Sequence, residues 1–239
     1  MLPRYVVSGL IALWLAAPVA AQETSSAQYT ISVSGLTAGK MTLAANHDGA
    51  SYALTSNTAS AGLAGLFRSF SVITRAQGAE RDGRLIPARY SAQADGAREG
   101  RGAELAFKGG VATVVKADAP APEAPVVDPA QHNGAIDPLT GLYAILRDTD
   151  PARACQLDFK MFDGHRISRV TLSSPAAVGD GLMCQGVYRR IDGYPAEELA
   201  KRGSFPFAVT YRPAENGKLR VTEVSMDSLF GPARMTRDN

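Results

Sequence analysis

The sequence predicts a mainly β fold, in which a curved antiparallel sheet forms an open or spiral barrel and one helix near 138–148 covers it. The first observation is a series of turn dipeptides, because Asp-Gly, Asn-Gly and Gly-Gly pairs supply the positive φ angles of tight hairpins. They occur at 48–49, 82–83, 95–96, 109–110, 163–164, 192–193 and 216–217. The second is the alternation of apolar and polar residues between these turns, which is typical of strands with one buried face. The third is that only one longer segment has a helical apolar period.

In the first half of the chain, about 28–116, the alternating runs predict a series of meandering strands. They are 28–34, 39–47, 50–59, 67–80, 85–94, 98–108 and 111–116. A short helical turn is expected at 61–66. The small and apolar residues at 62–67 are interpreted as core, with a movable lid as the alternative.

The helix follows a connector rich in Pro and Ala at 117–129. We expect this connector to be extended and to form neither a helix nor a hydrogen-bonded strand. Asp137 is available as N-cap and Pro138 fits the first helical position. Leucine and tyrosine then recur at helical spacing and predict an apolar stripe on a helix packed against the sheet. The stripe consists of Leu139, Leu142, Tyr143 and Leu146.

In the second half, about 153–236, the pattern of strands and turns resumes. The predicted strands are 155–162, 165–172, 182–191, 205–213, 218–227 and 229–236, with a helical turn at 196–201. No internal sequence repeat accompanies the turns. We therefore expect one β-rich domain over 22–239, built of two halves that the connector and the helix join.

The stretch KMFDGHRISRV at 160–170 carries a histidine close to an aspartate and an arginine, but it also reads as a hairpin. Pairing about a two-residue turn at 163–164 places Asp158 opposite Arg169 and His165 at a solvated tip. In this register Arg166 is the one charged residue on the apolar face. If this stretch is a hairpin, there is little reason to expect that His165 is a catalytic residue.

Residues 1–21 are typical of a cleavable secretory signal. Arg4 supplies the positive start, an apolar run at 6–16 follows, and small residues at 19–21 fit a cleavage site before Gln22. The alternative is a retained N-terminal anchor. We expect a periplasmic protein with no stable membrane span after signal cleavage, because no later run reaches 18 apolar residues.

The charge pattern argues against nucleic acid as a partner. The net charge is +2, and the basic residues are interspersed with acidic ones rather than grouped with aromatic residues. Such a composition lacks the basic footprint that binding to phosphate backbones requires.

The two cysteines, Cys155 and Cys184, predict a structural disulfide in an oxidising compartment. The bond closes a loop of about 30 residues, which stabilises by roughly 3–4 kcal/mol in the chain-entropy model. Outer strands of an ordered three-strand meander lie about 9.5 Å apart, beyond the reach of a disulfide. Either the segment carrying Cys155 bends over the end of the sheet, which we predict, or the strand at 182–191 does not neighbour the strand at 165–172.

No catalytic, cofactor-binding or metal-binding residues are predicted, and we expect the protein not to be an enzyme. The histidines His47, His132 and His165 lie next to turns or in an irregular stretch, without metal-ligand spacing. The chain has neither a Gly-x-Ser-x-Gly elbow nor a phosphate-binding Gly loop. The carboxylate pair at 197–198 is interpreted as a solvated helical face.

Four features occur in a specific order: YTISVSGLTAGKMTL, GAIDPLTGLYAILRD, FDGHR, and a cysteine ahead of VYRRIDGY. In this order they resemble the bacterial exported family catalogued as domain of unknown function 3108. The resemblance spans nearly the whole mature chain and implies no catalytic residues. In architecture alone, the chain also resembles LolA and LolB, curved β-sheet envelope proteins that hold acyl chains inside an incomplete barrel.

A curved sheet with one apolar face must cover that face with a helix, a loop or a ligand. The sequence thus predicts an envelope protein that binds a lipid, an acyl chain or a lipoprotein segment. The alternative is a structural or interaction protein of the cell envelope that acts through its surface, and a hydrolase is the least favoured class.

Overall fold

The computed structural model describes residues 23–62, 69–96, 102–120 and 123–238. The predicted signal at 1–21, most of the segments at 61–66 and 62–67, and the start of the predicted strand 98–108 lie outside these residues.

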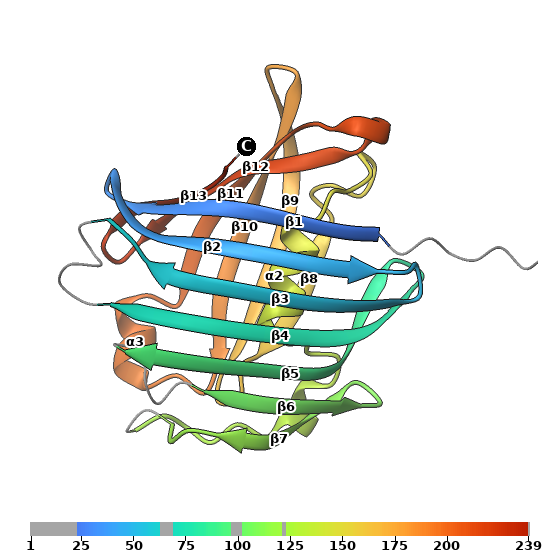
Figure 1. Ribbon diagram of the computed structural model, residues 1–239. Coiled ribbons are helices and arrows are strands. Elements are labelled where there is room, and N and C mark those ends of the chain that lie inside the picture. Colours follow the sequence, from blue (N-terminus) through green and yellow to red (C-terminus); the bar gives the residue numbers. More distant parts are fainter. Residues whose placement is uncertain (1–22, 63–68, 97–101, 121–122, 239) are drawn as a thin grey trace, which may run out of the picture.

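The described residues form one antiparallel sheet of 13 strands, which is nearly closed into a barrel with one open seam (Figure 1). The strands are β1 (Glu23–Val33), β2 (Leu36–His47), β3 (Ser51–Ser60), β4 (Phe70–Arg81), β5 (Arg84–Gly96), β6 (Ala103–Lys108), β7 (Val111–Ala117), β8 (Leu157–Phe162), β9 (Ile167–Val178), β10 (Gly181–Asp192), β11 (Ser204–Pro213), β12 (Leu219–Ser228) and β13 (Gly231–Arg237). The first strand pairs with the last, so the order runs from β7 through β1 and β13 to β8. The seam lies between β7 and β8. The predicted fold class is therefore confirmed.

Alternating side chains explain why the strands share one core. In β2, Met41, Leu43 and Ala45 are buried while the residues between them are exposed. Neighbouring strands continue the same face, since Ala45 lies opposite Leu54 of β3. The tight turns use the expected residues, and at Asp82-Gly83 both φ angles are positive, at 53° and 76°.

Helix α2 (Pro138–Leu146) lies inside the curve of the sheet, behind β1 to β4 in Figure 1. Its predicted cap is confirmed, because the Asp137 side chain accepts a hydrogen bond from the Thr140 amide at 2.8 Å. Gly141 allows close contact with β8: a Cβ at this position would lie 2.5 Å from Met161 Sδ. The helix ends at Leu146 rather than near residue 148, since Arg147 is already extended. A second short helix, α3 (Ala196–Lys201), matches the helical turn expected at 196–201.

The predicted register of the β8–β9 hairpin is wrong by two residues. Lys160, not Asp158, lies opposite Arg169. The cause is a longer turn, in which the Asp163 side chain accepts hydrogen bonds from the amides of His165 and Arg166 at 2.9 and 2.7 Å. A shift of two keeps each side chain on its predicted face. The Asp158–Arg169 ion pair therefore still forms, diagonally across the strands, at 2.7 Å.

The tip of this hairpin is packed rather than solvated, which corrects the expectation for His165. Gly164 is buried, and a Cβ there would lie 3.1 Å from Cβ of Ala103 in β6. The segment before α2 also spans the seam. Gly134 donates to the Gly110 carbonyl at 2.8 Å, and two residues later Ile136 exchanges backbone hydrogen bonds with β8. The loop before α2 and the tip of the β8–β9 hairpin thus connect the two edges of the sheet, β7 and β8, across the seam.

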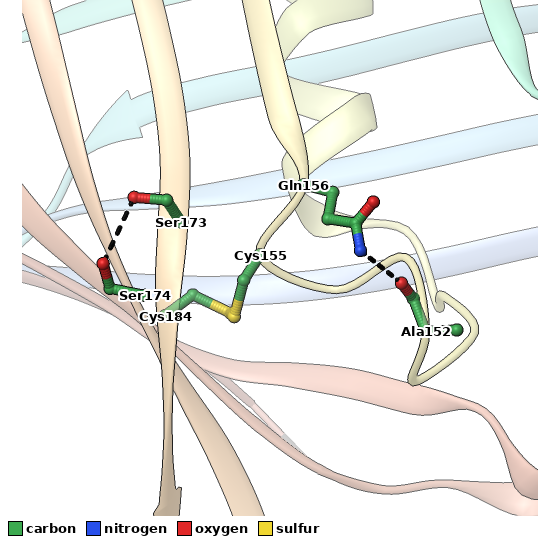
Figure 2. Close-up of a disulfide and its surroundings, with 6 residues drawn as sticks. All are labelled: Ala152, Cys155, Gln156, Ser173, Ser174 and Cys184. Carbon is green, nitrogen blue, oxygen red and sulfur yellow. Dashed lines mark hydrogen bonds between the residues drawn. A yellow bond between two sulfur atoms is a disulfide. The ribbon is translucent and has the colours of Figure 1, made fainter.

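A disulfide joins Cys155 and Cys184, whose Cα atoms are 5.2 Å apart (Figure 2). Strands β8, β9 and β10 pair in order, and Cys155 precedes β8. The sulfurs meet because the chain bends before β8, with Cys155 at a φ of 61°. The disulfide is typical of an oxidising, extracytoplasmic compartment. None of the helices in the described part of the chain is long and apolar enough to cross a membrane.

Candidate functional site

A cavity of about 290 Å³ opens at the end of the barrel where α2 stops. It lies between the C-terminal end of this helix, the beginning of β1, the end of β2 and the last residue of β13. Its walls are formed by Glu23, Ser25, Ser26, Ala27, Tyr29, Leu43, Ala45, His47, Glu80, Tyr143, Leu146, Arg147, Asp148, Thr149, Asp150, Arg153, Lys218, Arg220 and Arg237. The cavity therefore brings together six separate stretches of sequence.

The inner wall of the cavity is apolar because it continues the core. Leu43 and Ala45 of β2 and Leu146 of α2 are buried members of the core cluster. Tyr29 of β1 is 1% exposed, and burial raises the pKa of its hydroxyl while nearby Arg237 lowers it. A ligand that enters this cavity meets hydrocarbon at its inner end.

One side of the rim is an ion-pair network that links strands to the helix. Glu80 at the end of β4 accepts from Arg147 Nη1 at 2.8 Å and lies 2.8 Å from Nε2 of His47. Arg147 also donates to the Gly83 carbonyl at 3.2 Å and lies over the Tyr143 ring, 5.9 Å from its centroid. Burial alone would raise the pKa of Glu80, but Arg147 and His47 outweigh it and hold that pKa below its usual value.

The other side of the rim is fixed by a second pair. Arg220 Nε donates to both carboxylate oxygens of Asp148 at 3.1 Å, and its Nη2 donates to Oδ2 at 2.7 Å. Backbone hydrogen bonds of 2.9 and 2.8 Å between Thr149 and Leu219 hold the same two segments together. The segment after α2 is thereby fastened to β12.

Three further basic side chains of the rim have no carboxylate partner. Within the described residues, neither Arg153, Lys218 nor Arg237 forms an ion pair, whereas Arg147 and Arg220 do. The rim acids Glu23 and Asp150 also form none. The pairing is therefore incomplete at the mouth, and donors are left for a ligand.

A buried polar chain lies deeper, at the N-terminal end of α2. Thr140 donates to Asp137 Oδ2 at 2.6 Å, and Tyr52 OH lies 3.0 Å from Thr140 Oγ1. Asp137 is fully buried, and this burial raises its pKa to about 6 despite the hydrogen bonds from Thr140. These groups fasten the helix cap to β3, and none of Asp137, Thr140 and Tyr52 lines the cavity.

The histidines do not come together. His47 lies in the rim network, His132 lies 3.1 Å from Asp192, and His165 is half-buried in the hairpin turn. The ring hydrogen bonds that the described part of the chain shows go to carboxylates and to the Gly49 amide. The same part contains no group of three or more His, Cys, Asp or Glu residues that could hold a metal ion.

Arg166 is the charged residue that the predicted hairpin leaves on its apolar face. It lies over the Tyr194 ring, 5.0 Å from the centroid, and Nη2 is 3.4 Å from Glu198 of α3. Arg190 contacts the same ring at 5.1 Å and the same carboxylate at 3.5 Å. This cluster fastens α3 to the hairpin and lies apart from the cavity-lining residues.

Sequence reasoning missed the cavity, although it named three of the lining residues for other reasons: His47, Tyr143 and Leu146. Glu80 and Arg147 are 67 residues apart, and each looks like an ordinary surface charge in the sequence. Only the strand order shows that they meet. The one local signal is the position of Arg147 directly after the apolar stripe of α2, where a basic side chain commonly contacts the end of a helix.

The fold and the cavity define a barrel-like protein of one antiparallel sheet, with an internal helix and a charged mouth at one end. The chain belongs to the family of proteins of unknown function DUF3108, whose model matches residues 28–179. The resemblance drawn from the sequence is thus confirmed over residues 28–179, whereas its extension to the cysteine ahead of VYRRIDGY and the likeness to LolA and LolB stay predictions. One similar solved structure is a beta-barrel-like protein of domain of unknown function DUF1849 from Brucella abortus. The similarity has a TM-score of 0.48 and 15% identity, and it covers 91% of this chain and 96% of that chain. No curated protein matches the sequence.

Proposed function

We propose that this chain is an exported, non-catalytic protein of the periplasm that binds a lipid, an acyl chain or a lipoprotein segment. The observation that carries the proposal is the cavity at the end of α2, which has a hydrocarbon inner wall and a charged mouth. Such a combination suits an amphipathic ligand, because each part of the ligand meets surroundings of its own polarity.

The size of the cavity limits how much of a ligand it takes. At 290 Å³ it lies near the lower bound of ligand sites, which span about 300–1,000 Å³. A cavity of about 150 Å³ holds benzene, so roughly a dozen non-hydrogen atoms fit here. We therefore propose that one end of the ligand is bound, while the rest of a longer lipid remains outside the barrel.

The non-catalytic part of the proposal is supported by the arrangement of reactive groups. Hydrolytic sites need a nucleophile within hydrogen-bond reach of a base. Both cysteines are in the disulfide, and the histidine pairs described above join carboxylates rather than hydroxyl groups. The hydroxyl of Thr140 does contact the carboxylate of Asp137, but both residues are fully buried and do not line the cavity.

Native mass spectrometry of protein purified from its own periplasm, followed by lipid extraction, tests the proposal. We expect a bound amphiphile that is lost in Ala27→Phe, because Ala27 is half-buried in the cavity wall and a phenyl ring there fills the mouth. Ala44→Phe is the matched control, since Ala44 is exposed on β2 and absent from the wall. Protein that is empty in both the parent and the control contradicts the proposal.

A second function, contact with an envelope partner through the surface, is favoured by one observation. At the opposite end of the barrel, Leu36, Leu229 and Phe230 are 59%, 53% and 82% exposed. Their two turns are joined, because Ser34 donates its amide to the Pro232 carbonyl at 2.8 Å and its hydroxyl to the Phe230 carbonyl at 3.1 Å. Exposed apolar groups that lie together are typical of interaction surfaces.

A photo-crosslinker placed at Phe230, compared with one at the exposed Lys40 in β2, separates the two functions in cells. A stoichiometric partner captured only at Phe230, together with an empty cavity, favours the interaction protein. A ligand in the cavity without a crosslinked partner favours the binding protein.

A further inference from the structure

We propose that the ligand carries an anionic group, a carboxylate or a phosphate, which Arg237, Arg153 and Lys218 bind at the mouth while the adjoining hydrocarbon lies against the inner wall of the cavity. The inference rests on the proposed binding function and specifies the chemistry of its ligand.

The balance of charge in the rim supports an anion. Five basic side chains line the cavity: Arg147, Arg153, Lys218, Arg220 and Arg237. Four acidic side chains do so: Glu23, Glu80, Asp148 and Asp150. Glu80 and Asp148 are already bound by Arg147 and Arg220. Three cations and two exposed carboxylates therefore remain, and no ion pair within 4.0 Å joins them in the described residues.

Arg237 is placed at the inner end of the mouth by strand register. It lies directly opposite Tyr29 in the β1–β13 ladder, so the two side chains point to the same face of the sheet. Tyr29 is buried in the core, and this face is therefore the interior. A guanidinium carries five N–H donors, and a half-buried one without a carboxylate has donors left that suit an anion.

The other two cations come from segments that the fold fixes at the mouth. Lys218 directly precedes Leu219, which exchanges both backbone hydrogen bonds with Thr149. Arg153 lies two residues before Cys155, which the disulfide ties to β10. The Arg153 side chain crosses the turn at Gly83, where a Cβ would lie 2.0 Å from its Nη1.

The hydrocarbon wall and the three cations together specify the probe. Octanoate has ten non-hydrogen atoms and fits the size limit, and octyl phosphate places a phosphate on the same chain. The neutral analogue 1-octanol shares the chain but lacks the charge. Comparing octanoate with octyl phosphate distinguishes a fatty carboxylate from a phospholipid-like head group.

Calorimetric titration of the full mature chain with these three amphiphiles tests the inference. We expect at least one of the two anions to bind about tenfold or more tightly than 1-octanol, since hydrogen bonds to charged groups are the stronger kind. The Arg237→Gln variant is expected to lose most of this preference. Arg234→Gln is the matched control, because Arg234 is exposed on the same strand and absent from the cavity wall.

The outcomes separate the two proposals. Equal binding of 1-octanol and both anions overturns the anionic inference and leaves the binding function standing. Absence of binding for all three overturns both. The comparison of ligands on the parent chain needs no variant, so a folding defect in Arg237→Gln, checked by circular dichroism, leaves the test decisive.

Discussion

At the scale of single residues, the most constrained group is the buried carboxyl of Asp137. It caps α2 by accepting from the Thr140 amide and hydroxyl, and Tyr52 extends the chain of contacts to β3. Burial raises its pKa to about 6, so between about pH 4 and pH 6 the folded protein holds a proton that an unfolded Asp has already released. A capping residue thereby becomes a source of pH-dependent stability.

We expect the stability difference between the parent and Asp137→Asn to depend on pH. From about pH 4 to pH 6 the folded state binds more protons at this site than the unfolded state, so parental stability falls as pH rises. Relative to that of Asp137→Asn, the free energy of unfolding of the parent falls by about 3 kcal/mol across this range. Above pH 6 the difference between the two proteins no longer depends on pH.

Urea unfolding at a series of pH values measures this dependence. An asparagine still presents a carbonyl oxygen to the Thr140 amide, so the helix cap is retained. Asp128→Asn, which changes the exposed cap of the short helix Pro129–His132, is the control. A pH-independent difference between the parent and Asp137→Asn contradicts the prediction.

At the scale of elements, close packing between α2 and β8 sets the distance of the helix from the sheet. A methyl group at Gly141 would lie 2.5 Å from Met161 Sδ and 2.9 Å from Phe159 Cε2. We expect Gly141→Ala to destabilise by about 1–3 kcal/mol, although alanine favours helices by roughly 1 kcal/mol.

A double-mutant cycle with Met161→Ala identifies the cause of that loss. The Met161→Ala background removes the closer of the two contacts and leaves the one with Phe159, so Gly141→Ala should destabilise less there than in the parent. The melting temperatures of the parent, the two single variants and the double variant measure how strongly the effects of the two substitutions depend on each other. An equal cost in both backgrounds contradicts the packing argument.

The disulfide is the second element-scale constraint, because it ties the bend before β8 to β10. We expect the Cys155→Ala, Cys184→Ala double variant to lose about 3 kcal/mol, as a loop of this length implies. Guanidinium unfolding of the variant and of the oxidised and reduced parent measures the loss. Equal stability of the oxidised and reduced parent would rule the contribution out.

Much of the element level could be predicted from the sequence, and the reasons are local. Turn dipeptides and alternation located the strands, and Asp137-Pro138 located the start of α2. The register of the β8–β9 hairpin was wrong because Asp163 caps a longer turn with its side chain, which a two-residue pattern does not reveal. The cavity was missed because Glu80, Arg147 and Arg237 meet only through the strand order.

At the scale of the whole molecule, closure depends on β13, which pairs with β1 on one side and β12 on the other. Thr236 lies opposite Thr30 and Glu223, so a proline there interrupts an interior strand. We expect Thr236→Pro to destabilise by at least about 3 kcal/mol and to populate oligomers through the opened edges.

Val115→Pro is the matched control for this prediction. Val115 is 64% exposed in the edge strand β7 and has no register partner across the bulge there. Its replacement should cost far less, and size-exclusion chromatography with light scattering compares the two variants. Equal loss in both would mean that closure at β13 is unimportant.

The pairing of the first strand with the last also determines the order in which the molecule is completed. Thr30 hydrogen-bonds Asp238, 208 residues further along the chain. During synthesis the N-terminal end emerges first. The edge of β1 that pairs with β13 therefore has no partner until nearly the whole polypeptide has been made. Contacts of such long sequence separation make folding slow, because a large loop must close before they form. The emerging half-sheet therefore exposes an unpaired strand edge, and both cysteines of the disulfide precede the final strand β13 in the chain.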